Sequence, residues 1–398
     1  MIYLKNNKIK NIEERQKKLN ENLAKQLKKY DIKKLRLTSM GNSIASGYSM
    51  VRSVKPLLLR NESIKKIMEE NNINLERYNF ARAQNNNDEH IFEWLETNIK
   101  ESEVFKINRF DYSKFPTSTW TYGLNDRLKD EYYPLNKIKD MGLKDAVTES
   151  KDDLANIIVY NGCSGSFLDG ITRKGFLSQK IMYGINRDLT SIESSIKVIQ
   201  TNNRLNNSNT QIYLCGVPNY LGLNVSEIIN HRLKKLASKY ANVVYVEPVK
   251  AKLFYKKLKS DEYFDLPRYK RRIKSSDLHY DEKEYLKLNN NIIESIYNNY
   301  SITKALINLD RNMYKFNSKI ELKNSELFKD QIDRKKEIIL DIILKELESI
   351  DGYDSKKIFL NKAKKYLLTR TPYDFYVTGK KEIKNSIEKV KELVKNLR

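Results

Sequence analysis

The sequence predicts an α/β fold: a three-layer, doubly wound, parallel sheet of five strands with a helical C-terminal extension. Short apolar runs typical of buried strands alternate with segments whose apolar residues recur at helical spacing, which favours right-handed βαβ units. Beyond about residue 300 only helical patterns remain. We expect an N-terminal helical segment over 1–33, an α/β domain over 34–299 with an insertion at about 100–153, and the extension over 300–398.

Composition is that of a globular protein with a substantial core, since 40% of the 398 residues are hydrophobic and 31% are charged. We find no signal-peptide core and no run long enough to span a bilayer, so we expect a cytoplasmic protein. The net charge of +23 indicates either an anionic partner (acidic polymer, membrane surface or nucleic acid) or a lysine-rich composition on a solvated surface. Lysines lie along the whole chain, which favours the second interpretation.

The two cysteines, Cys163 and Cys215, each end a strand-like run, as small buried hydrophobic residues do. A reducing compartment is consistent with this use of cysteine, and no Cys/His cluster has the spacing of a zinc site.

The first strand is expected over 35–40, after the N-terminal helix, and Gly41 breaks it. Residues 41–47 then read Gly-Asn-Ser-Ile-Ala-Ser-Gly. Ser43 either caps the helix of an ordinary strand-to-helix turn or is presented as a nucleophile at the carboxyl edge of the sheet, where α/β proteins build active sites.

This segment resembles the first block of the SGNH (GDSL-type) hydrolases, which reads Gly-Asp-Ser-(Leu or Ile)-x-x-Gly after a hydrophobic strand. Gly41, Ser43, Ile44 and Gly47 match the block, and Asn42 stands in place of the family's Asp. The resemblance implies the flavodoxin-like, five-stranded sheet of that family and a serine nucleophile at Ser43. It also implies that the other blocks follow in order.

A helix over 61–70 and a strand over 77–81 come next, and residues 79–84 are similar to the second block, Asn-x-Ala-x-x-Gly. Gln84 occupies the place of the family's glycine, whose backbone N–H contributes to the oxyanion hole. A backbone donor survives a change of side chain, but glutamine reaches positive φ less readily than glycine. The alternative is a turn redrawn around residues 85–87.

The third block is expected after the strand at 157–160. The family's Asn there donates a side-chain hydrogen bond to the oxyanion. Ser164 takes its place, or Gly165 if the register slips by one, and a hydroxyl can also donate.

Either Asn161 or Asn125 could supply the missing amide. Asn125 belongs to residues 123–126, which spell the family's Gly-x-Asn-Asp but follow no strong strand.

Helices over 189–202 and 225–240 are predicted to precede strands over 211–218 and 243–246. His279 then follows the last strand and precedes a further helical pattern, in a segment that resembles the final block, Asp-x-x-His-Pro, with Tyr280 in place of Pro. The resemblance implies that His279 is the general base.

Two interpretations of the acid that orients His279 stay open. In the first, the block is one residue shorter than in the family, and Asp277 is the acid. In the second, no acid is present, and Ser276 or a main-chain carbonyl assists His279. The other histidines, His90 and His231, lie inside helical patterns and are expected at surface or packing positions.

A basic segment at 267–274 precedes His279. Its Arg271 and Arg272 either contact an acidic group of the substrate or belong to a solvated loop. Together with Asn42 and Gly162 they are our candidates for substrate binding.

The C-terminal helical patterns at 331–350 and 383–397 predict either an appendage packed on the core or a partner-binding or self-associating arm.

The resemblance implies a serine ester hydrolase that works through a Ser43, His279 and Asp277 triad and an acyl-enzyme. Its oxyanion hole would comprise Ser43, Gln84 and Ser164, without a metal or cofactor. The first expected substrate is an O-acetyl group on a carbohydrate or cell-envelope glycan, and a lipid ester is the second. The alternative is a protein of this fold with a decayed site, whose basic surface binds an anionic partner.

Overall fold

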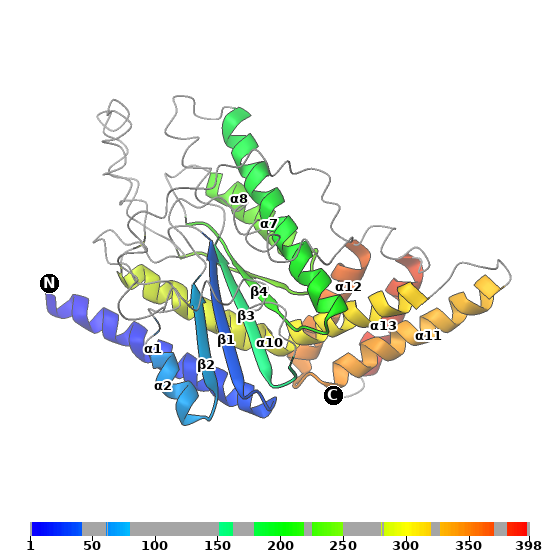
Figure 1. Cartoon of the computed structure of the whole chain (residues 1–398), viewed down its shortest axis with the longest axis horizontal. Coiled ribbons are helices and arrows are strands. Elements are labelled where there is room, and N and C mark those ends of the chain that lie inside the picture. Colours follow the sequence, from blue (N-terminus) through cyan, green and yellow to red (C-terminus); the bar gives the residue numbers. More distant parts are fainter. Residues whose placement is uncertain are drawn as a thin grey trace.

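The computed structural model describes residues 2–41, 61, 63–79, 151–161, 179–218, 225–249, 280, 282–319, 327–369 and 380–395. Its centre is a five-stranded sheet in the order β2-β1-β3-β4-β5, and every neighbouring pair is parallel (Figure 1). The strands are β1 (Lys34–Gly41), β2 (Asn74–Asn79), β3 (Leu154–Asn161), β4 (Gln211–Cys215) and β5 (Val243–Val246). This confirms the predicted α/β class, and the order is consistent with the flavodoxin-like layout.

The helices that surround this sheet run from the N-terminus to the C-terminal end of the chain. They are α1 (Ile2–Lys29), α2 (Ser63–Glu70), α7 (Gln179–Leu205), α8 (Val225–Ala237), α10 (Glu282–Lys319), α11 (Leu327–Glu348), α12 (Tyr353–Thr369) and α13 (Lys380–Lys395).

Helices cover both faces of the sheet. Gln211 of β4 donates a hydrogen bond from Nε2 to the carbonyl oxygen of Tyr300 in α10, at 3.0 Å. On β5, the ring of Tyr245 lies under the ammonium of Lys234 in α8, 5.1 Å from its centroid. Tyr245 pairs in register with Leu214 of β4, so these two side chains point to the same face of the sheet. Leu214 is an odd number of residues from Gln211 in the same strand, so Gln211 points to the other face. Because neighbouring residues of a strand point to opposite faces, α8 and α10 lie on opposite sides, with α1 beside α10 and α2 beside α1 (Figure 1).

The predicted second strand differs from the observed one. It was expected over 77–81, whereas β2 begins at Asn74, directly after a turn in which Asn72 has a φ of 59°. The first residues of β2 lack an apolar pattern because β2 is an edge strand, where polar residues are tolerated. One of them, Glu76, pairs with Arg36 of β1 at 2.9 Å. That pairing also explains how Arg36 can be 1% exposed in a central strand.

Helix α10 joins two hydrophobic clusters. Its first half, through Tyr300, packs in the core of the sheet, and its second half, from Ile302, packs in a cluster with α11, α12 and α13. The helix is continuous through the expected domain boundary at residue 300.

The C-terminal cluster lies at the amino edge of the sheet. Asp310 of α10, 2% exposed, accepts two hydrogen bonds of 2.9 Å from Arg204, which precedes β4. Asp351, which precedes α12, pairs at 2.7 Å with Lys29, just before β1. These helices are therefore attached at the end of the sheet away from the carboxyl edge. None of the helices that the structure describes is long and apolar enough to cross a membrane.

Candidate functional site at the carboxyl edge of the sheet

Strands β1 and β3 end beside each other. Gly41 of β1 pairs in register with Asn161 of β3, and these are the last residues of the two strands. Gly41 has a φ of +125°, and a Cβ at this position would lie 1.9 Å from the carbonyl oxygen of Asn161. Only glycine fits both constraints. The glycine that opens the first sequence block thus has a physical role: it allows the carboxyl ends of β1 and β3 to approach.

The side chain of Asn161 is a buried amide at this junction. It is 0% exposed, and neither Nδ2 nor Oδ1 makes a hydrogen bond within the described part of the chain. An unsatisfied buried polar group costs about 1–3 kcal/mol, so its presence needs an explanation. A strong donor kept beside Gly41 is suited to a negatively charged oxygen that arrives with a ligand.

On the other side of β3, the residues after β4 are fixed by α8. The amide of Asn230 donates from Nδ2 to the oxygen of Val217 at 2.9 Å and accepts from its N–H at 2.8 Å. Gly216 lies against Tyr245, since a Cβ on this glycine would be 2.2 Å from the Tyr245 hydroxyl oxygen. This part of the edge is therefore rigid scaffold.

The last residue of β4, Cys215, confirms the interpretation of a buried hydrophobe. It is a free thiol, 1% exposed, and burial raises its pKa to about 12. Such a thiol is not a nucleophile near neutral pH.

Tyr280 ties the segment before α10 to the end of β5. It is 2% exposed, its hydroxyl donates to the carbonyl oxygen of Val249 at 3.4 Å, and its ring packs edge-on against Tyr285 with centroids 5.4 Å apart. Val249 follows β5 by three residues, so Tyr280 is held near the carboxyl edge of the sheet. His279 is its neighbour in the chain.

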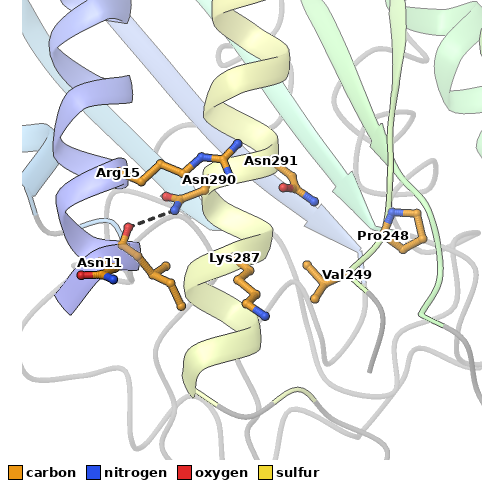
Figure 2. A pocket seen from close by; sticks show the side chains of 8 residues that line it. Asn11, Arg15, Pro248, Val249, Lys287, Asn290 and Asn291 are labelled. Carbon is orange, nitrogen blue, oxygen red and sulfur yellow. Dashed lines mark hydrogen bonds between the residues drawn. The ribbon is translucent and has the colours of Figure 1, made fainter. Parts of the chain in front are cut away.

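A pocket of about 460 Å³ opens beside this tie, between α1, α10 and the residues after β5 (Figure 2). The described residues of its walls include two cationic side chains, Arg15 and Lys287, and no carboxylate. The residues that line it are Asn11, Ile12, Arg15, Pro248, Val249, Lys287, Asn290 and Asn291.

The amide of Asn290 joins the two helices of this pocket by donating to the carbonyl oxygen of Ile12 at 3.0 Å, across 278 residues of sequence (Figure 2). Sequence reasoning missed the pocket, because no local pattern shows that α1 and α10 lie side by side.

Apart from the candidate amide Asn161, the residues that the sequence predicts for catalysis and substrate binding lie outside the described residues. They are Asn42, Ser43, Gln84, Gly162, Ser164, Arg271, Arg272, Asp277 and His279. His90 also lies outside them, whereas His231 is exposed on α8, in line with its expected surface position. Within the described ranges, no three His, Cys, Asp or Glu side chains gather as metal ligands would.

No protein-family model matches this chain, and no curated protein matches it.

Proposed function

We propose that this protein is an SGNH-type serine ester hydrolase that cleaves a carboxylic ester at the carboxyl edge of its sheet. The observation that carries the proposal is the junction of β1 and β3, where Gly41 lies against Asn161. Parallel α/β sheets bind their ligands at this edge, at the topological switch point. This is the place where successive strands are added first on one side of the starting strand and then on the other. In the order β2-β1-β3-β4-β5, that point is the boundary between β1 and β3.

Chain connectivity supports the assignment of the nucleophile and the base. Ser43 follows Gly41 by two residues, and two residues span at most about 7 Å. The serine hydroxyl therefore belongs to the edge where β1 ends. His279 precedes Tyr280, whose hydroxyl bonds Val249 beyond β5, so the base belongs to the same edge.

In the proposed reaction, His279 removes the proton of Ser43, whose oxygen attacks the ester carbonyl. The alcohol leaves with a proton from His279, and water then releases the acyl group by the same route. Asp277 orients the imidazole and stabilises its charged form. The substrate is an O-acetyl group on a carbohydrate or, as second choice, a lipid ester. Cytoplasmic placement is part of the same proposal.

We assign the oxyanion to the backbone N–H groups of Ser43 and Gln84, with Ser164 and the Asn161 amide as side-chain donors. The buried amide of Asn161 supports this role, because it makes no hydrogen bond among the described residues. One such donor contributes about 10²–10³ in kcat.

Hydrolysis of p-nitrophenyl acetate tests the assignment of Ser43 and His279. We expect Ser43→Ala and His279→Ala to lower kcat at least about 10³-fold. His231→Ala is the matched control, because this histidine is exposed on α8. Activity that survives Ser43→Ala would refute the proposal.

A second pair of variants separates the oxyanion role from folding. Asn161→Ala should lower kcat about 10²–10³-fold while leaving the unfolding midpoint unchanged or higher, since it removes an unpaired buried amide. Asn242→Ala is the control. Asn242 is also 0% exposed with both amide atoms unpaired within the described residues, but it lies at the amino end of β5. Equal activity of the two variants would exclude Asn161 from the site.

A further inference from the structure

The pocket between α1 and α10 has the chemistry of a site for an anionic sugar. We propose that it binds the acidic part of an oligosaccharide substrate, a proposal that rests on the ester hydrolase proposed above and names its substrate class. Three features of the pocket point to this ligand: its charge, the kinds of side chain that line it, and its distance from the junction of β1 and β3.

Positive charge in the pocket comes from two side chains. The Arg15 guanidinium bonds the carboxylate of Glu294 at 2.9 Å, so its charge is partly compensated. No ion pair to Lys287 occurs among the residues that the structure describes, and Figure 2 shows its side chain next to Val249. Because none of the described wall residues carries a carboxylate, an acidic group of a ligand can pair with Lys287.

The other walls of the pocket suit a carbohydrate better than a bare anion. Asn11 and Asn291 present amides, which can donate to and accept from hydroxyl groups. Asn291 donates to the carbonyl oxygen of Glu247 at 3.3 Å, which fixes the orientation of its amide. Ile12 and Val249 provide an apolar surface for the C–H face of a sugar ring. The volume of about 460 Å³ lies within the range of small-molecule sites.

The position of the pocket sets the length of the ligand. Pro248 and Val249 line it directly beyond β5, and β5 is separated from β1 by β3 and β4. Three inter-strand spacings amount to about 14 Å. A simple ester at Ser43 cannot span this distance, whereas an oligosaccharide of several units can. Binding of the acidic group in the pocket, at a distance from the reacting bond, would then help to hold the ester in place.

Calorimetry on the Ser43→Ala protein tests the pocket without turnover. The ligands are trigalacturonic acid, which carries carboxylates, a phosphorylated maltotriose, and neutral maltotriose. We expect either anionic ligand, or both, to bind at least tenfold more tightly than maltotriose, and the better one identifies the acid group. If neither anionic ligand binds, or if maltotriose binds equally well, the proposal is wrong.

Two variants locate the binding. Lys287→Gln should weaken the anionic ligand about tenfold, since a charged hydrogen bond is lost. Lys365→Gln is the matched control, because this lysine is exposed on α12, at the amino edge of the sheet. Equal effects would place the ligand elsewhere. Hydrolysis is measured separately in the Ser43 protein, so binding without hydrolysis would refute the esterase and not the pocket.

Discussion

Replacement of Gly41 by alanine is the most direct perturbation of the junction between β1 and β3. The added methyl would lie 1.9 Å from the carbonyl oxygen of Asn161, about 1.4 Å closer than the ~3.3 Å of a close C···O contact. The backbone φ of +125° is also strained for alanine. Backbone strain and overpacking each cost about 1–3 kcal/mol, so we expect a loss of about 2–6 kcal/mol in unfolding free energy.

The control for this experiment is Gly352→Ala. Gly352 also has a positive φ, +77°, but a Cβ there would meet no heavy atom within 4 Å. Only the cost of the left-handed conformation, about 1–2 kcal/mol, is expected. Urea unfolding followed by circular dichroism measures both changes. If Gly41→Ala costs no more than Gly352→Ala, the close contact between Gly41 and Asn161 does not exclude a side chain at position 41.

The same variant should also lower activity in the protein that remains folded. The strand ends must separate by more than 1 Å to accept the methyl group, given the 1.9 Å contact. A displacement of this size between nucleophile and oxyanion donor costs about 10²-fold in rate. Unchanged hydrolysis per folded molecule would contradict the placement of the site at Gly41 and Asn161.

Three further predictions concern buried groups away from this edge. Asp310→Asn removes a carboxylate that Arg204 contacts through two bonds of 2.9 Å, so we expect a loss of about 3–5 kcal/mol in urea unfolding. The control, Glu388→Gln, breaks a pair in which Glu388 is 47% exposed and should cost less than about 1 kcal/mol; equal losses would contradict this account. Burial lowers the pKa of Lys362 to about 8 from 10.5, so the unfolded chain binds more protons between these values and stability should rise with pH across them. Lys362→Met should flatten that rise in midpoints measured from pH 8 to 10.5, and an equal rise in both proteins would refute it. Because burial raises the pKa of Cys215 to about 12, this thiol should react with a disulfide reagent only as the protein unfolds; peptide mapping that finds it labelled in the native state would count against this.

Strand β3 could be predicted from sequence because most of its residues are apolar on both faces. Residues of β3 are buried along its whole length, and its apolar run stands out between polar segments. The edge strand β2 was misplaced, because Asn74 and Glu76 interrupt its pattern and the partner of Glu76 lies on another strand. Local patterns indicate burial, but they do not show which strand pairs with which.

The same limit applies to the site. The sequence identified Gly41 as the end of a strand and Asn161 as one of two candidate amides. Their contact depends on the register of β1 against β3, which is not encoded locally because the two residues lie 120 positions apart in the sequence. The pocket at Lys287 depends in turn on the pairing of α1 with α10. Long-range packing, not residue type, was the missing information.

Labelling with a fluorophosphonate, read by intact mass and peptide mapping, tests the central claim most directly. The account predicts one adduct per chain, on Ser43, which is lost in both Ser43→Ala and His279→Ala. A folded wild-type protein that stays unlabelled, or that is labelled at another residue, would contradict an activated serine at this edge. The decayed-site alternative, a binding protein for an anionic partner, would then be favoured.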